Sequence, residues 1–203
     1  RPITKEAIFH YVYGVLHDPV YREKYALNLK REFPRIPFYA DFWQWADWGR
    51  ELMDLHIGYE SVEPWSLERI DLPMDGGQPV KRVQSKSLVA EADAKPSANT
   101  KADTPKALLR ADKAGGRILL DSQTTLAGVP PDAWNYKLAN RSALEWVLDQ
   151  YKEKTPKDPT IREKFNTYRF ADHKEKVIDL LARVSRVSVE TQRIVTDMRH
   201  APR

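Results

Sequence analysis

Apolar residues recur at intervals of three and four near both ends of this chain, a spacing that predicts amphipathic helices. Five segments carry the pattern: residues 3–17, 18–33, 41–59, 140–151 and 172–198. In the first segment the predicted buried face comprises Ile8, Val12, Val15 and Leu16. In the third segment it comprises Phe42, Trp45, Trp48, Leu52, Leu55 and Tyr59. Trp45 and Leu52 are therefore predicted to be core residues.

Polar residues mark where these helices begin. Thr4, Asp18 and Asn140 precede the apolar stripes at the N-cap position, where a side-chain oxygen accepts a hydrogen bond from a free backbone N–H. Pro19 follows Asp18 as the first helical residue, where its missing N–H costs nothing. Pro34 ends the second segment, because it forces the preceding residue away from helical angles.

The middle of the chain follows a different pattern. Residues 71–105 combine a Gly-Gly pair with four prolines and a run rich in Ala, Ser, Lys and Asp, which is typical of a long surface loop. Residues 106–121 predict a β-hairpin with Gly115-Gly116 near its turn, and residues 124–129 predict another strand. The expected fold is α+β and mainly helical, with a small antiparallel strand region (71–128) between helical parts (1–70 and 129–203), which together make one domain.

Positive charge is concentrated in that strand region. The whole chain carries a net charge of only +4, but residues 81–117 hold nine Lys or Arg against four acidic residues. Cations in or beside the strands have few acidic neighbours in the sequence, and Arg110 and Arg117 flank the predicted turn. The cations of residues 22–31 alternate with acids and predict a solvated helix face instead. The strand region is thus the predicted binding surface for a polyanion.

Several kinds of chemistry lack the residues that they require. The chain has no cysteine, which excludes disulfides and thiolate metal sites, and no apolar run approaches the roughly 18 residues of a membrane span. His10 and His17 lie two helical turns apart, about 10.5 Å along the axis, too far to share one zinc ion. Asp75 and the later Asp93-Ala94-Lys95 follow the order of acidic and lysine residues in metal-dependent nucleases. No predicted strand would hold the second group in place beside the first. Asp172 and His173 lack a partner residue for catalysis and instead predict the N-terminus of a helix.

The stretch VPPDAWNY (residues 129–136) resembles a degraded form of the Asn/Asp-Pro-Pro-aromatic loop of adenine methyltransferases. Val129 stands where that loop needs a hydrogen-bonding side chain, and Asp132 stands where it needs an aromatic ring. No cofactor-binding Gly-rich loop accompanies it. The residues favour a structural turn, in which Asp132 begins a helical turn that carries Trp134 and Tyr136 into the core.

Four blocks, taken together and in order, resemble the C-terminal specificity region of type ISP restriction–modification enzymes: residues 3–38, 49–60, 128–155 and 177–195. The third reads GVPPDAWNYKLANRSALEWVLDQYKEKT and the fourth VIDLLARVSRVSVETQRIV. In that family one polypeptide joins a nuclease, an ATP-driven DNA translocase, an adenine methyltransferase and a target recognition domain. The resemblance implies that this chain is a noncatalytic fragment, the recognition domain, of such a longer polypeptide.

The resemblance also implies partners and cofactors. The expected partners are double-stranded DNA and the upstream methyltransferase and helicase domains, in a prokaryotic cytoplasm with no membrane. S-adenosylmethionine, ATP and Mg are expected only for the upstream domains, and none of them for this fragment. The predicted DNA-facing residues are Lys81, Arg82, Lys86, Arg110, Lys113 and Arg117. The alternative is a module that docks on a methyltransferase or helicase core through its Trp-rich third helix.

Overall fold

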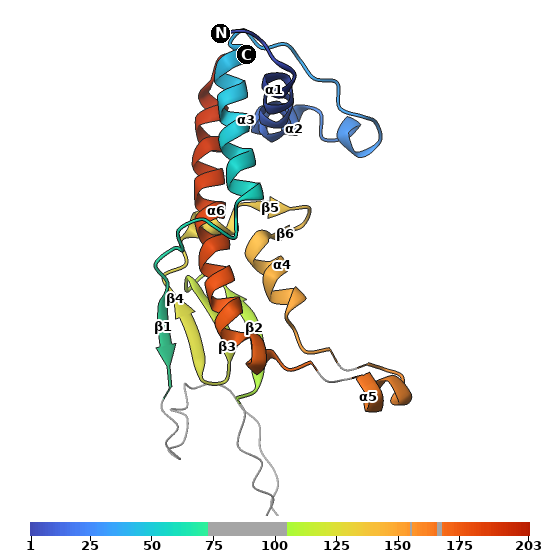
Figure 1. Ribbon diagram of the computed structural model, residues 1–203, viewed down its shortest axis with the longest axis vertical. Helices are drawn as coiled ribbons and strands as arrows, with labels where there is room; N and C mark the ends of the chain where they lie inside the picture. The colour runs from blue at the N-terminus through green and yellow to red at the C-terminus, as the bar shows by residue number, and fades with distance from the viewer. Residues whose placement is uncertain (73–104, 155, 166–167) are drawn as a thin grey trace, which may run out of the picture.

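Helix α6 (Lys174–His200) is the longest element of the computed structural model and packs against both halves of the chain (Figure 1). The structure describes residues 1–72, 105–154, 156–165 and 168–203. The elements before α6 are α1 (Lys5–His17), α2 (Pro19–Lys24), η1 (Asn28–Lys30), α3 (Phe42–Ile57), β1 (Glu68–Asp71), β2 (Ala107–Asp112), β3 (Arg117–Asp121), β4 (Thr124–Ala127), η2 (Pro131–Trp134), β5 (Lys137–Leu138), β6 (Arg141–Ser142), α4 (Ala143–Gln150), α5 (Pro159–Phe165) and η3 (Phe170–His173). This arrangement confirms the predicted mainly helical α+β fold.

Two hydrophobic cores share α6. The first lies between α1, α2 and α3, and the C-terminal half of α6 contributes Ile194 and Met198 to it. The second lies between the sheet, η2 and α4, and the N-terminal half of α6 contributes Val177 and Leu181. Figure 1 shows the three N-terminal helices at one end of α6 and the sheet at the other. Because one continuous helix belongs to both cores, it holds them in a fixed relation.

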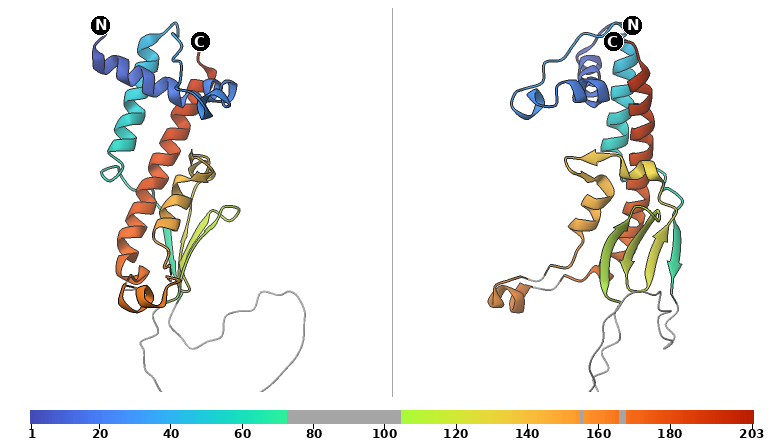
Figure 2. Two further views of the ribbon diagram at one scale, coloured as in Figure 1. Left: turned by 90° about the vertical axis from the view of Figure 1, so that its right-hand side faces the viewer. Right: turned by 180° about the vertical axis from the view of Figure 1, so that it is seen from behind.

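Helix α1 crosses α3 at a point where two glycines meet (Figure 2, left). A Cβ atom on Gly49 would lie 1.8 Å from the carbonyl oxygen of His10, so only hydrogen atoms fit between the backbones. This crossing buries Ala7, Tyr11, Gly14 and Val15 of α1. The predicted inner face was therefore partly wrong, since Ile8 points outward and is 49% exposed. The close contact selects the face of α1 with the small residues, not the one with the most large apolar side chains.

Helix α2 ends earlier than predicted. Asp18 caps it as expected by accepting a hydrogen bond from the backbone N–H of Val20, but the helix stops at Lys24 and a short 3-10 turn follows. Tyrosine side chains then bind the extended backbone that leads to α3. Tyr21 donates to the carbonyl of Arg35 at 2.9 Å, and Tyr11 donates to the carbonyl of Pro37 at 2.8 Å. These tertiary contacts replace the helical turns that the periodicity predicted.

Helix α3 has the predicted register. Asp41 caps it, and Trp45 and Leu52 are both fully buried, as predicted. Its Trp-rich surface therefore packs into the chain's own core, with Trp43 and Trp48 half-buried, and is not a free docking face.

Trp45→Ala and Leu52→Ala are each expected to lower the free energy of unfolding by about 2–5 kcal/mol, because each deletes a fully buried side chain and leaves a cavity. Urea denaturation followed by circular dichroism measures this. Met53→Ala, on the half-buried side of the same helix, is the control and should lose less. Equal midpoints for all three variants would contradict the helix register.

The four strands form one antiparallel sheet in the order β1-β4-β3-β2. The predicted hairpin is present, with residues 113–116 between β2 and β3. One face of the sheet buries Ile118, Leu120 and Leu126 in the second core. Strand β1 was not predicted, because its four residues are all exposed and carry no apolar alternation. Its hydrogen-bond partner, β4, lies more than 50 residues later in the chain.

The VPPDAWNY stretch is a structural turn, as predicted. Pro131–Trp134 form a 3-10 turn, with Val129 and Trp134 buried in the second core and Tyr136 half-buried. The predicted cap of the next helix was wrong: Ser142, not Asn140, caps α4. The Ser142 side chain bonds the backbone N–H of Glu145 and Glu145 bonds back, which satisfies two free N–H groups at once.

A cluster of rings joins the two cores around His56. Its Nδ1 lies 2.7 Å from the Tyr13 hydroxyl, and its Nε2 lies 2.9 Å from the Thr191 hydroxyl on α6. Tyr136 stacks on the imidazole with 5.3 Å between ring centroids. Burial, together with the nearby His17, lowers the pKa of His56 to about 4. The imidazole is therefore neutral at physiological pH and serves as a hydrogen-bonding link between α1, α3 and α6.

Candidate nucleic-acid interface

The predicted DNA-facing residues fall into two groups. Lys81, Arg82 and Lys86 lie outside the described residues, as do Asp75, Asp93 and Lys95 of the nuclease-like order. Arg110, Lys113 and Arg117 lie on β2, in the hairpin turn and at the start of β3, and all three are exposed. The structure therefore brings these three together at one hairpin.

Two of these cations have acidic partners that were not predicted. The Nζ atom of Lys113 lies 2.9 Å from a carboxylate oxygen of Glu145 on α4. The Nε atom of Arg117 lies 4.0 Å from a carboxylate oxygen of Asp112, across the turn. The sequence shows few acidic residues around these cations, but it does not show which of them form ion pairs. Glu145 comes from a distant part of the sequence, and the turn folds Asp112 back toward Arg117.

Glu145 holds Lys113 in place. Burial raises the pKa of its carboxyl, but hydrogen bonds from Ser142 and the ion pair with Lys113 outweigh this and lower the pKa to about 2. Glu145 is thus ionised at neutral pH and serves both the cap of α4 and the hairpin turn. This contact links the hairpin to the start of α4.

A bulge in β2 sets the direction of Arg110. The pairing with β3 shifts between Ala107 and Arg110, and Leu109 adopts a left-handed backbone with φ of 44°. Leu109 is buried in the second core, whereas Arg110 is exposed. Bulges on edge strands commonly redirect a side chain in this way, at a local cost in backbone strain. Among the described residues Arg110 has no ion-pair partner within 4.0 Å.

Arg110 lies in a shallow groove between the free edge of the sheet and α4, of about 320 Å³, which we call the β2–α4 groove. Figure 2 (right) shows α4 beside the β2 edge of the sheet. The groove is lined by Leu109, Arg110, Ala111, Arg141, Glu145, Leu148, Asp149 and Lys152. Its floor is apolar and its rim is charged.

Three more cations meet at this rim. Arg141, Lys152 and Lys154 lie 3.4, 3.5 and 3.8 Å from the carboxylate of Asp149. With Arg110, Lys113 and Arg117 they make six cations, against the three carboxylates of Asp112, Glu145 and Asp149. The sequence reasoning missed Arg141, Lys152 and Lys154, because they lie 20 or more residues beyond the end of β3. The basic composition of the connector after α4 was a signal for Lys152 and Lys154, but Arg141 lies before α4.

The described residues contain no group of three or more His, Cys, Asp or Glu side chains that could hold a metal ion. Asp172 and His173 lie in η3, directly before α6, and the imidazole of His173 stacks on the ring of Tyr168. No helix in the described part of the chain is long and apolar enough to cross a membrane.

Comparisons with known proteins place this fold among restriction–modification enzymes. A family model described as the Type ISP C-terminal specificity domain matches residues 1–180. The cryo-EM structure of a DrdV–DNA complex matches 96% of this chain at 59% identity, with a TM-score of 0.79. A nuclease-deletion mutant of the Type ISP restriction–modification enzyme LlaGI, in complex with a DNA substrate mimic, matches 96% at 27% identity and a TM-score of 0.64.

A third solved structure shares the fold. The ATP-dependent Type ISP restriction–modification enzyme LlaBIII bound to DNA matches 99% of this chain at 22% identity, with a TM-score of 0.64. The present chain covers only 18%, 14% and 11% of the DrdV, LlaGI and LlaBIII chains. No curated protein matches the sequence.

Proposed function

Since the chain belongs to the family of Type ISP C-terminal specificity domains, we propose that it recognises the DNA target of a longer, single-chain restriction–modification enzyme. Its relatives DrdV and LlaGI are solved in complexes with DNA or a DNA mimic. In this proposal the 203 residues are noncatalytic. They position DNA for an adenine methyltransferase, an ATP-driven translocase and a nuclease elsewhere in the same polypeptide.

The β2–α4 groove and the hairpin beside it carry this proposal. Six cations meet there at a strand edge, and all except Arg110 form ion pairs with carboxylates at or near the surface. Exposed ion pairs of this kind contribute only about 0–1 kcal/mol each, so DNA phosphates can replace the carboxylates at little cost. Released counterions then add to the free energy of binding. The groove is thus suited to a phosphate backbone.

Arg110 is the best candidate for reading a base. A two-stranded β-ribbon fits the major groove of DNA, where a guanidinium forms paired hydrogen bonds to guanine O6 and N7. The bulge at Leu109 directs Arg110 outward, and no carboxylate of the described residues lies within 4.0 Å to hold its guanidinium. Lys113 and Arg117 are better suited to phosphates, since each is already held by a carboxylate.

The test uses the full-length enzyme with Arg110, Arg141 and Lys152 replaced by Ala. The slope of log affinity against log salt concentration should fall by about one for each phosphate contact removed. If Arg110 reads a base, Arg110→Ala alone should weaken DNA binding by ~1–3 kcal/mol and relax the base preference at one position of the target. Fluorescence anisotropy on cognate and shuffled duplexes measures both effects. A second triple, Arg110, Lys113 and Arg117, tests the hairpin itself.

The matched control removes the same charge from the other end of the molecule. Arg50, Arg193 and Arg199 each form an exposed ion pair with an acidic neighbour in the N-terminal helical part. Replacing these three by Ala should leave the salt slope nearly unchanged. Unchanged affinity and unchanged sequence preference in both groove and hairpin triples would place the DNA surface elsewhere.

The parent enzyme would supply the chemistry. S-adenosylmethionine, ATP and Mg would be bound by its other domains, and the 203-residue chain alone would transfer no methyl group and hydrolyse no ATP. Such an enzyme would act on DNA in a prokaryotic cytoplasm.

A further inference from the structure

Three large apolar side chains are exposed on the segment between α2 and α3. Phe38 is 99% exposed, Phe33 is 95% exposed and Leu27 is 72% exposed. We call residues 25–38 the aromatic arm. Single exposed apolar side chains are ordinary, but several in one short segment are typical of surfaces that bind another macromolecule. Figure 1 shows the arm projecting sideways from the helical end of the molecule, away from the sheet.

The backbone of the arm is held firmly where it presents Phe38. Tyr11 donates to the carbonyl of Pro37, and the backbone N–H of Tyr39 donates to the Tyr11 hydroxyl at 2.7 Å. The Tyr39 ring packs on Trp45 with 4.5 Å between ring centroids. Pro37 and Tyr39 are thus both tied inward, and extended backbone turns the side chain between them outward. The fold itself keeps Phe38 in solvent.

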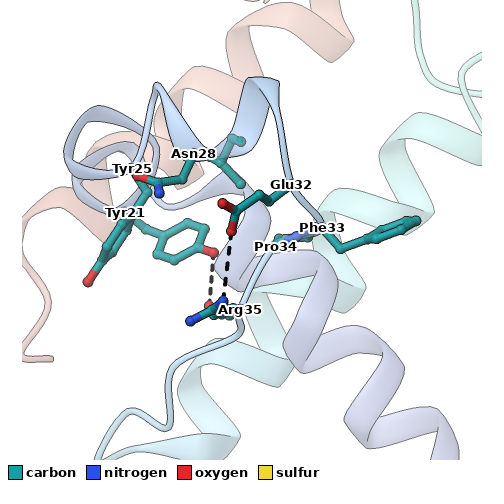
Figure 3. A pocket seen from close by; sticks show the side chains of 8 residues that line it. Tyr21, Tyr25, Asn28, Glu32, Phe33, Pro34 and Arg35 are labelled. Carbon is teal, nitrogen blue, oxygen red and sulfur yellow. Dashed lines mark hydrogen bonds and ion pairs between the residues drawn. The ribbon is translucent and has the colours of Figure 1, made fainter.

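A cavity of about 440 Å³ lies within the arm (Figure 3). Tyr21, Tyr25, Leu29 and Pro34 supply apolar walls, and the ion pair of Glu32 and Arg35 lies at its edge. Figure 3 shows the ring of Phe33 pointing away from the other labelled side chains. An exposed aromatic ring beside a hollow with both aromatic and charged walls is typical of the residues that contribute most to binding in protein–protein interfaces.

Charge around the arm favours one kind of partner. Lys24, Lys30, Arg31 and Arg35 are exposed along it, while Glu32 lies next to Arg35 at 3.8 Å. A protein surface with an apolar centre and an acidic rim would complement both features. A DNA duplex would match the cations but leave the phenylalanines and Leu27 facing phosphates. The arm also projects from the end of the molecule that lies away from the sheet and its basic groove.

We propose that the aromatic arm docks on an apolar, acid-rimmed surface of another domain in the same long polypeptide. This inference rests on the proposed function, because it requires the chain to be part of a larger enzyme. In its relatives most of the polypeptide lies outside the matching region, which is 18% of the DrdV chain and 14% of the LlaGI chain, so such a polypeptide has room for the partner domain.

Site-specific photo-crosslinking in the full-length enzyme tests the docking surface. Benzoylphenylalanine is placed at Phe33 or Phe38, and at the control position Ile57, which is 75% exposed on the end of α3. After irradiation with bound DNA, mass spectrometry identifies the attached peptides, and mixed isotope labelling separates links within one chain from links between copies. Links from the arm to residues of the same chain outside these 203 are expected. Links to DNA, links to a second copy, or yields no higher than at Ile57 would each overturn the proposal.

A double variant provides the second measurement. Phe33→Ser with Phe38→Ser in the full-length enzyme should increase the rate of limited proteolysis between this domain and the rest of the chain at least several-fold. The salt slope of DNA binding should stay unchanged, because the groove is intact. An unchanged rate of proteolysis would overturn the docking proposal, whether or not the salt slope changes. The salt slope of the variant with Arg110, Arg141 and Lys152 replaced by Ala tests only the proposal of DNA recognition. The docking proposal and the recognition proposal can therefore fail separately.

Discussion

Gly49→Ala is expected to destabilise this chain by about 5 kcal/mol, a very large loss for the addition of one methyl group. Alanine within a helix is normally more favourable than glycine by about 1 kcal/mol. Here the added Cβ would lie 1.8 Å from the carbonyl oxygen of His10 and 2.8 Å from the backbone nitrogen of Gly14. No side chain can move aside to relieve this overlap, so α1 must separate from α3 and open the first core. Alanine at position 49 is therefore expected to destabilise the protein, although its helix propensity alone would stabilise it.

Thermal and urea denaturation of Gly49→Ala and Gly115→Ala measure this difference. At Gly115 the added Cβ meets mainly the Asp112 and Arg117 side chains, which can turn away, so the loss should stay below about 1 kcal/mol. Gly14→Ala should also be strongly destabilised, since its Cβ would lie 2.4 Å from the carbonyl oxygen of Trp45. A Gly49→Ala variant as stable as the parent would show that the two helices do not cross as described.

Asp18→Ala is expected to cost a similar amount, about 5 kcal/mol, because one buried carboxylate serves three groups. It caps α2 through the backbone N–H of Val20, accepts a hydrogen bond from the Tyr39 hydroxyl at 2.7 Å, and pairs with Arg203 at 2.9 Å. Loss of the cap costs about 1 kcal/mol. The two partners left without an acceptor cost about 1–3 kcal/mol each, and more for the charged one.

Acid should weaken the same contact. Burial raises the pKa of Asp18, but the hydrogen bonds from Arg203, Tyr39 and Val20 outweigh it, and the net pKa is lowered. A carboxyl with a lowered pKa in the folded state stabilises the protein above its unfolded pKa, near 3.9, and this contribution is lost as pH falls through the folded value. The parent should therefore lose stability below about pH 4 more steeply than Asp18→Ala does.

The exposed pair of Glu23 and Arg199 is the control for this prediction. It links α2 to α6 as the Asp18 pair links α2 to the residues after α6, but its side chains are 64% and 48% exposed. Glu23→Ala should cost less than about 1 kcal/mol. Equal losses for Asp18→Ala and Glu23→Ala in urea denaturation would contradict the buried network.

The sequence by itself determined the elements whose signals lie within a few residues. Thr4 and Asp18 cap helices, as predicted, because a side-chain oxygen reaches N–H groups two or three residues ahead. The hairpin of β2 and β3 and the turn of VPPDAWNY follow from glycine and proline at fixed local positions. The register of α3 followed from its wide apolar stripe, which placed Trp45 and Leu52 in the core. The specificity-domain resemblance was likewise carried by blocks of sequence in order.

Only the tertiary structure decided which surfaces meet. Gly14 and Gly49 select the inner face of α1, although another face holds more large apolar residues. Hydrogen bonds from Tyr11 and Tyr21 replace the predicted end of α2 with an extended segment and leave Phe33 and Phe38 exposed.

The charged groove depended on the same kind of contact. Glu145 meets Lys113, and Arg141, Lys152 and Lys154 meet around Asp149, because α4 packs beside the edge of the sheet. Caps and turns act over a few residues of chain. Burial and ion pairing act between residues that are close in space, and the sequence alone does not say which distant residues those are.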